Sequence, residues 1–450
     1  MTEITNWCRR LVVMGISASL WTAEVLGDSQ PITLQAVLKL AGSQNRSVEL
    51  AAERVREARA TLTRDREQLF PWVSPGVAYR RHDGNLQDVV GNVFDASKQS
   101  GVAALTLQAQ IELGDTLYRV LASKQSVKSI EAGEVVQRRN TVQQAATAYA
   151  ELSRAAASIE AAEESERIAE DFLRQVRQAV EAGLAFSGDA VRAEVQLQRN
   201  QSLRLRAQEE LRLASVRLAE LLRLPMTIEL RPDLSEFVPL TLVSTNRPLD
   251  ALVASALAHR PELHQSQAQS AGAEALKNGT TVGPWFPTLG AQAAVGGLAG
   301  GRNGDFRNGD DFQEYGVAAS WKIGPGGIGD RSRIRSAESR LRQTKILEEQ
   351  MRDAILREVL EARARTDSAA AQVELAGKTV TSSRRLLEIS HARREFGVAA
   401  VLEAVDAERE YTRARSDQLR AVADHNRLQW DLWRAVGEGE PDGSPTSPRR

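Results

Sequence analysis

The sequence predicts a mainly α-helical protein with a β-barrel that crosses a membrane, built from a duplicated unit of helix, strand, strand, long helix and helix. Three observations predict this fold class: a repeat that covers most of the 450 residues, helical patterns too long for a compact domain, and four segments that alternate between apolar and polar side chains. Aromatic residues make up only 5% of the chain, so long helices packed through small side chains fit better than a bulky globular core.

Residues 1–27 have the pattern of a secretory signal peptide. Arg9 and Arg10 precede the apolar run Leu11–Met14, and small residues near position 27 offer a cleavage site. Glu3 and the lack of an Ala-x-Ala site leave one alternative, a short amphipathic or buried N-terminal helix. We expect export, with cleavage near the end of this segment.

Charge and cysteine content exclude several classes of protein. The formal net charge is -1 with 26% charged residues, so no nucleic acid is expected as a partner, because phosphate binding needs a concentrated basic patch. Cys8 is the single cysteine, which excludes an internal disulfide framework and a multi-cysteine metal site. No stretch of about 18 apolar residues follows the leader, so a membrane protein of this sequence has to cross as a β-barrel.

An internal repeat divides the chain into a first unit, 28–223, and a second unit, 248–436. Each unit opens with a similar helical pattern that breaks at a Phe-Pro pair, because proline ends a helix and favours an extended continuation. The proline-rich segment 224–247 connects the units at the equator, and 437–450 is expected to be a disordered tail. The landmarks, first unit and then second, are Leu34 and Leu249, Phe70-Pro71 and Phe286-Pro287, and Gly183–Glu194 and Gly397–Glu408.

The helical patterns are unequal, and the two middle ones are very long. At 1.5 Å per residue each middle helix would span roughly 100 Å, so two shorter helices laid end to end match one long helix. This arithmetic suits a layered bundle rather than a compact domain. Gly183 and Gly397 are natural C-terminal caps of the middle helices, and Ser187 is a reasonable N-cap. The expected helices are 32–69, 115–182 and 187–223 in the first unit and 249–283, 330–396 and 400–436 in the second.

Two segments in each unit alternate as a strand with one dry face and one wet face does. The expected strands are 71–81, 102–113, 287–299 and 313–324. Parity assigns one face to lipid, namely Leu105, Leu107, Ile111, Val317 and Trp321. It assigns the other face to the water of a barrel lumen, namely Thr106, Gln108, Gln110, Glu112, Ser320 and Lys322.

A soluble antiparallel sheet covered by a helix would show the same alternation. Four features favour a bilayer. The strands are long enough to cross it at a tilt, and aromatic residues such as Trp72 and Trp285 gather at strand ends. The connections 82–100 and 300–312 are rich in Gly, Asn and Asp, as exposed loops are. Four strands cannot close a barrel alone, so their edges require several copies of the chain.

Signals of an enzyme, a metal site or a cofactor site are weak. The five histidines show no His-x-x-x-His spacing and have no cysteine partner beyond the leader. Gly324–Gly329 follows an expected strand and precedes a helix, but it lacks the Gly-Lys-Ser/Thr ending of a phosphate loop and lies in no βαβ unit. We interpret it as the passage from strand to helix and expect no catalytic, metal or cofactor site.

The duplication, the order of elements and the motif Gly183-x-x-x-Ser187-x-Asp189-x-Val-x-Ala-Glu194 together resemble the TolC-like outer-membrane efflux protein family, over about 30–436. The resemblance implies a homotrimer in which four strands per chain form one twelve-stranded barrel, continued by an α-helical tunnel. It implies an outer-membrane location with a large periplasmic portion, in a Gram-negative type of cell. It also implies passive conduction of substrates to the exterior, with outer-membrane lipid, a periplasmic adaptor protein and an inner-membrane transporter as partners.

The resemblance places the two repeated turns at periplasmic tips, where partners dock and the tunnel is gated. The second turn has Val401 where the first has Ser187, so the two tips are not equivalent. Ordinary capping and helix packing is the alternative reading of these residues. The implied docking residues are Gly183, Ser187, Asp189, Gly397, Val401 and Glu403, and the implied gate residues are Arg393, Arg394, Glu395 and Asp406.

A non-membrane coiled-coil scaffold is the alternative function, because Ala-rich helices would also fit it. The signal-like leader and the paired strands between the helices favour the channel. The transported substrate, whether a drug, a metal ion or a protein, does not follow from the sequence.

Overall fold

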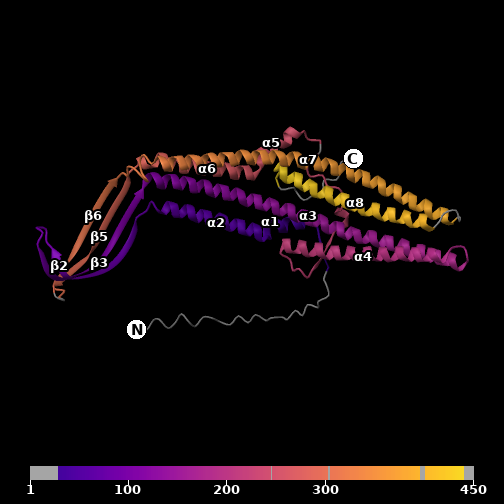
Figure 1. The fold of residues 1–450 in the computed structure, drawn as a ribbon, viewed down its shortest axis with the longest axis horizontal. Helices are drawn as coiled ribbons and strands as arrows, with labels where there is room; N and C mark the ends of the chain where they lie inside the picture. Colours follow the sequence, from indigo (N-terminus) through magenta and orange to yellow (C-terminus); the bar gives the residue numbers. More distant parts are fainter. Residues whose placement is uncertain (1–28, 245, 303–304, 396–400, 440–450) are drawn as a thin grey trace.

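The computed structural model describes residues 29–244, 246–302, 305–395 and 401–439. The expected leader, Gly397 and residues 440–450 lie outside this part of the chain. Figure 1 shows an elongated molecule with a β-sheet at one end and helices along the rest of its length. Helix, two strands, long helix and helix occur twice in order, so the predicted mainly α-helical fold class is confirmed.

Two long helices run along the molecule (Figure 1). α3 spans Leu113–Glu181 with 69 residues, and α7 spans Arg331–Glu395 with 65 residues. Each is therefore roughly 100 Å long. α4, Ser187–Leu222, and α8, Val401–Val436, fold back along them with 36 residues each. None of the described helices is both long and apolar enough to cross a membrane.

The first helix of each unit is interrupted, which corrects the two single helices expected over 32–69 and 249–283. Asn45 breaks the first because its side chain caps the next helix, accepting a hydrogen bond from the backbone N–H of Ser47 at 2.8 Å. Pro261 breaks the second because its ring keeps the preceding residue out of helical geometry. Four short helices result: α1 (Leu34–Gln44), α2 (Arg46–Glu67), α5 (Leu249–His259) and α6 (Pro261–Thr281).

The strands form one antiparallel sheet in the order β2-β3-β5-β6. β2 and β6 are the edge strands, and each pairs with a single neighbour in the described sheet. The chain leaves the sheet into α7 through Gly324–Gly329, as predicted, and three of these glycines have positive φ. The strands are β2 (Trp72–Gln87), β3 (Val93–Glu112), β5 (Thr288–Arg302) and β6 (Asn308–Ser320).

The β2–β3 hairpin is longer than predicted, which corrects the loop expected over 82–100. Asp88 turns the chain, because its Oδ1 accepts hydrogen bonds from the backbone N–H of Val90 at 3.0 Å and of Asn92 at 2.8 Å. This side-chain turn fixes the register of strand ends that are too polar to be recognised as strands. β6 likewise begins inside the loop expected over 300–312.

The middle of the molecule joins the two units. β1, Ser29–Ile32, pairs in parallel with β4, Glu229–Pro232, which comes from the connecting segment and is followed by the short 3-10 helix η1, Leu234–Glu236. Trp430 of α8 and Leu252 of α5 belong to a buried apolar cluster here that also includes Val142 of α3. Residues from both units therefore share one core.

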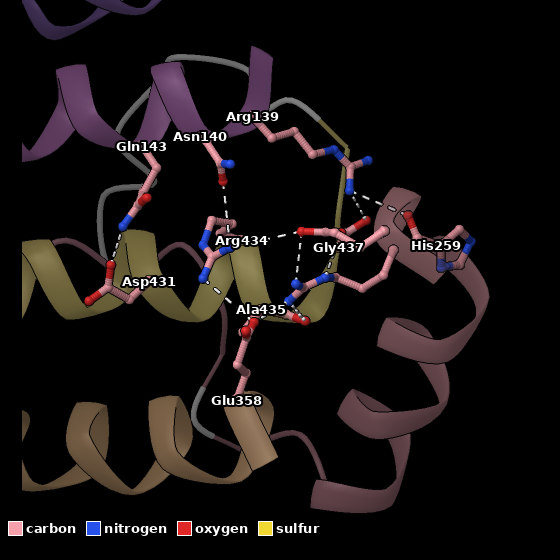
Figure 2. A network of polar contacts seen from close by, with 11 residues as sticks. Arg139, Asn140, Gln143, His259, Glu358, Asp431, Arg434, Ala435 and Gly437 are labelled. Atoms are coloured by element: carbon pink, nitrogen blue, oxygen red, sulfur yellow. Dashed lines mark hydrogen bonds and ion pairs between the residues drawn. The ribbon is translucent and has the colours of Figure 1, made fainter. Parts of the chain in front are cut away.

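A network of polar contacts holds the helices of this middle region together (Figure 2). Arg139 of α3 donates from Nη1 to the carbonyl oxygen of Gly437 at 3.2 Å and to that of His259 at 3.4 Å. Arg434 of α8 makes an ion pair with Glu358 of α7 at 3.5 Å. Since these residues come from both units, the network fixes the ends of α5 and α8 against the long helices.

Arg260 lies at the break between α5 and α6 with only 2% of its side chain exposed. Its guanidinium contacts the carboxylates of Glu262 and Glu358 at 2.8 Å each. It also donates to the carbonyl oxygen of Ala435 at 3.3 Å. A charge this deeply buried is tolerated because two carboxylates and a carbonyl oxygen accept its hydrogen bonds.

The end of α8 is ordered for longer than predicted, which corrects the disordered tail expected from 437. Gly437 adopts a φ of 73°, the left-handed conformation of a helix C-cap. Beyond it, Trp433 donates from Nε1 to the carbonyl oxygen of Gly439 at 2.9 Å. The chain therefore stays packed through residue 439.

Candidate tip and channel surfaces

The turn between α3 and α4 lies at the end of the molecule opposite the sheet (Figure 1). Gly183 has a φ of 74°, and its N–H donates to the carbonyl oxygen of Val180 at 3.0 Å. The N–H of Leu184 donates to the carbonyl oxygen of Ala179 at 2.8 Å. This pair of bonds is a Schellman cap, so the predicted capping by Gly183 is confirmed.

Ser187 is not the N-cap of α4, which corrects that prediction. The capping position belongs to Phe186, whose extended backbone accepts a hydrogen bond from the N–H of Asp189 at 2.9 Å. Ser187 is the first helical residue. Asp189 lies in the first turn, where a carboxylate interacts favourably with the helix dipole, and it pairs with Arg192 at 3.4 Å.

Apolar side chains are exposed at this tip. Leu184 and Phe186 are each 84% exposed, and Val191 in the next turn is 59% exposed. Sequence reasoning missed these residues because it examined only the glycine, the serine and the aspartate of the motif. Exposed apolar side chains next to one another are typical of an interaction surface.

The second tip brings together only some of the predicted gate residues. Arg393 near the end of α7 pairs with Glu403 in the first turn of α8 at 2.7 Å. Asp406 instead pairs with Arg409 of its own helix at 3.4 Å. Gly397 and the side chains of Arg394 and Glu395 lie outside the described residues. One of the expected charged contacts therefore joins the two helices.

An apolar cluster joins three helices just behind the tips. Phe172 and Val176 of α3 are buried against Ala193 of α4 and Val405 of α8. Val401, predicted as a docking residue, packs partly buried against this cluster. Its contacts are those of a packing residue, which the alternative reading anticipated.

A buried polar layer follows this apolar cluster, and sequence reasoning missed it as a site. Glu408 of α8 is only 1% exposed. Its Oε1 accepts a hydrogen bond at 2.7 Å from Nδ2 of Asn200 on α4, which also donates to the carbonyl oxygen of Ser165 on α3 at 2.9 Å. Gln196 donates to Asn200 Oδ1 at 3.3 Å. A signal was present in the sequence: Glu408 falls at the helical spacing that places Ala404 and Tyr411 on the buried face of α8.

Burial raises the pKa of Glu408 to about 7, although the hydrogen bond from Asn200 opposes the rise. Asn200 and Gln196 line a groove of about 630 Å³ between α4 and α8. The polar layer therefore lies beside a groove large enough to hold water, so the carboxyl group can exchange protons with solvent. Below neutral pH Glu408 is neutral and fits its buried position, whereas above it a charge has to be held there.

The sheet register aligns the predicted faces across all four strands. Directly opposed residues of an antiparallel sheet point to the same face. One row across the sheet is Val73, Leu107, Ala293 and Tyr315, and the next is Trp72, Gln108, Gln292 and Gly316. Val317 shares the face of Leu107, and Ser320 shares the face of Gln108. The relative parity of the two residue sets is confirmed on the paired strands.

Trp321 and Lys322 lie beyond the last paired residue of β6, so the register leaves their assignment to faces a prediction. β6 ends at Ser320, because β5 begins at Thr288 and offers no partner beyond it. The chain then turns, and the carbonyl oxygen of Lys322 accepts a hydrogen bond from the N–H of Ile328 at 2.8 Å. Trp321 donates from Nε1 to the carbonyl oxygen of Trp285 at 3.3 Å, so both tryptophans mark the helical end of the sheet.

The fold and the two tips define a class of protein in which paired long helices continue a sheet. The sequence profile of the outer membrane efflux protein family matches residues 37–222 and 252–438. The chain belongs to this family of TolC-like outer-membrane channel proteins. Its location is therefore the outer membrane of a Gram-negative cell, with a large periplasmic portion.

Solved structures share this fold at low sequence identity. The outer membrane protein VceC from Vibrio cholerae is 19% identical with a TM-score of 0.77, over 90% of this chain and 96% of that chain. The CmeC outer membrane channel of Campylobacter jejuni is 17% identical with a TM-score of 0.73, over 90% and 85%. The open state of the MtrE channel of Neisseria gonorrhoeae is 20% identical with a TM-score of 0.72, over 90% and 88%. No curated protein sequence matches significantly.

Proposed function

We propose that the chain is the outer-membrane duct of a tripartite efflux or secretion system. It passively conducts substrates from an inner-membrane pump and a periplasmic adaptor to the exterior, and it is a channel rather than an enzyme. The observation that carries this proposal is the sheet register, which aligns one apolar face and one polar face across four strands. A sheet with these two faces separates lipid from water.

The working assembly in this proposal is a homotrimer. β2 and β6 each leave one edge unpaired in the described sheet. Unpaired backbone groups are costly in lipid, so these edges pair with those of neighbouring copies and the strands close into one barrel of twelve. Leu105, Leu107, Ile111 and Val317 then face lipid, and Thr106, Gln108, Gln110, Glu112 and Ser320 face the lumen.

The tips dock the partners and gate the tunnel in this proposal. Leu184 and Phe186 offer an apolar contact to an adaptor beside Asp189, and the Arg393–Glu403 pair holds α8 against α7. Gly183 supports the first surface by its left-handed cap. Gly397, Arg394, Glu395 and Asp406 remain candidates for the same roles at the second tip.

The test combines mass and conductance. Native mass measurement in mild detergent should give a trimer, and planar bilayers containing the purified protein should show discrete single-channel currents. The scaffold alternative would leave the membrane fraction without detergent and would carry no current. A stable monomer, or a protein that leaves the membrane fraction without detergent, would overturn the proposal.

Docking is tested at Gly183. Gly183→Val should penalise the left-handed cap by about 1–2 kcal/mol, which disturbs the tip without unfolding the sheet. Trimer mass should be unchanged while efflux of a dye in cells falls. Gly188→Val, whose position has no positive φ, is the matched control.

A further inference from the structure

The β2–β3 hairpin extends beyond the other two strands at the end of the sheet far from the helices. β3 pairs with β5 only from Lys98 onward, whereas β2 and β3 pair with each other as far as Gln87 and Val93. Within the described sheet, Asp83–Gln87 and Val93–Ser97 pair only with each other. We call residues 83–97 the extension. Figure 1 shows it turning away from the line of the sheet.

The two faces of the sheet exchange polarity in the extension. On the face that continues Leu105 and Leu107, five of its six paired residues are polar: Asp83 opposite Ser97, Asn85 opposite Asp95, and Gln87 opposite Val93, which is the apolar one. On the face that continues Thr106 and Gln108, they are apolar: Leu86 opposite Phe94, and Gly84 opposite Ala96. The face that is polar along the four-stranded sheet is therefore apolar in the extension.

The extension is a fixed structure that presents this apolar face. Asp88 fixes the turn through its bonds to Val90 and Asn92, and Gly84 adopts a φ of 130°, which allows the strand to bend where pairing with β5 ends. Phe94 on this face is 46% exposed, and Val90, in the turn beyond the paired residues, is 86% exposed. Apolar side chains held in water by an ordered turn indicate a surface that something covers.

We propose that the apolar face of the extension packs against the same face of the other copies in the trimer and closes the outer mouth of the channel. This inference rests on the proposed function, because the face of Gln108 is then the lumen side and continues toward the trimer axis. A threefold axis brings three identical apolar faces together there. The opposite face carries Asp83 and Asp95, so it suits water rather than lipid.

Cross-linking tests the contact between copies. In a Cys8→Ser background, Val90→Cys should form a disulfide between two copies on mild oxidation, because equivalent residues meet near the axis. Asn85→Cys lies on the polar face and should not cross-link. The readout is a dimer band on a non-reducing gel that reduction removes.

Accessibility tests the closure. Gln108→Cys, in the same background, should react slowly with a bulky membrane-impermeant maleimide applied to intact cells. Adding Phe94→Asp should raise the labelling rate by about tenfold or more, which corresponds to 1.4 kcal/mol or more of lost contact. Asn85→Asp adds the same charge on the other face and should leave the rate unchanged. This readout does not depend on the state of the periplasmic tip.

The outcomes separate the two proposals. A trimer in which Val90→Cys does not cross-link, or in which Phe94→Asp leaves labelling of Gln108→Cys unchanged, would overturn the closure and leave the duct intact. If Val90→Cys is protected from the maleimide in membranes but reacts with it in detergent-purified trimers, the extension contacts lipid. That result would also overturn the closure. A monomer, or Leu107→Cys labelled as fast as Gln108→Cys when both variants also carry Phe94→Asp, would overturn the proposed function itself.

Discussion

Glu194 and Glu408 occupy the same position of the repeat, yet their surroundings are opposite. Glu194 on α4 is exposed and pairs with Arg177 of α3 at 3.5 Å. Glu408 on α8 is buried and accepts a hydrogen bond from Asn200. α8 contacts α3 and α4 of the first unit as well as α7 of its own. At this position the duplication preserves the helix, while the second copy of the glutamate is buried between helices of both units.

The break in the first helix of each unit shows the same divergence. Asn45 and Arg260 stand at equivalent positions, each between two helices and each buried. Asn45 acts by capping, and it also donates from Nδ2 to the carbonyl oxygen of Leu221 at 2.9 Å. Arg260 acts by ion pairs with two carboxylates. The two breaks share a position in the fold, but different side-chain contacts hold them.

The largest effect we predict distinguishes these two breaks. Arg260→Ala should lower the free energy of unfolding by about 3–5 kcal/mol, because Glu262 and Glu358 lose their buried partner. Asn45→Ala should cost only about 0.5–2 kcal/mol, the value of a helix cap. Urea unfolding of the detergent-solubilised protein, followed by circular dichroism, measures both. Equal losses would show that the ion pairs of Arg260 contribute no more to stability than the cap of Asn45.

In the sheet the two units should instead behave alike. Leu107→Arg in the first unit and Val317→Arg in the second place a charge on the same face, and each should cost about 2–4 kcal/mol if that face meets the bilayer near its middle. Gln108→Arg, one residue away on the other face, should cost little. The amount of trimer recovered from outer membranes is the measurement. Equal tolerance at Leu107 and Gln108 would contradict the assignment of the faces.

The two equivalent glutamates should differ in pH dependence. The pKa of Glu408 is raised to about 7 from an ordinary 4.5, so the native state binds its proton more tightly than the unfolded state. This contribution is fully present below about pH 4.5 and is lost as the pH rises through 7.

Glu408→Gln should therefore stabilise the protein by about 1–3 kcal/mol at pH 8 and flatten the pH profile, since a neutral amide avoids the buried charge. Glu194→Gln, its exposed counterpart, should change neither. Thermal unfolding between pH 5 and pH 8 is the measurement. A wild-type profile that rises toward pH 8 and is unaffected by Glu408→Gln would contradict the role of burial.

Sequence reasoning predicted the fold through its longest regularities. The repeat, the two long helices and the parity of Leu107 against Gln108 depend on many residues, so single errors average out. It failed where one side chain decides the backbone. Asn45 ends a helix by one hydrogen bond, and Asp88 sets a hairpin by two, inside segments whose composition indicates helix and loop.

The candidate site was predicted less completely, for a related reason. Gly183 was found because a left-handed cap requires a glycine, whereas Ser187 was misplaced because Phe186 caps through its backbone, which any residue can do. Glu408, Asn200 and Gln196 were missed because their meeting depends on how α4 and α8 approach each other. No spacing within one helix carries that information.

The smallest effect we predict compares the two tips. Arg393 and Glu403 pair across two helices, whereas Asp189 and Arg192 pair within one. The side chains of the first pair are 51% and 38% exposed, so it contributes under about 1 kcal/mol per copy. Arg393→Glu should nevertheless raise single-channel conductance in planar bilayers, because repulsion from Glu403 moves α8 away from α7. Arg192→Glu should not, because its partner lies on the same helix and no second element moves. The double reversal of Arg393→Glu with Glu403→Arg should return conductance toward its starting value, since the attraction is rebuilt with the charges exchanged. If the double variant conducts as much as Arg393→Glu alone, the ion pair does not hold the tunnel closed. The gate then lies among the other contacts of α8.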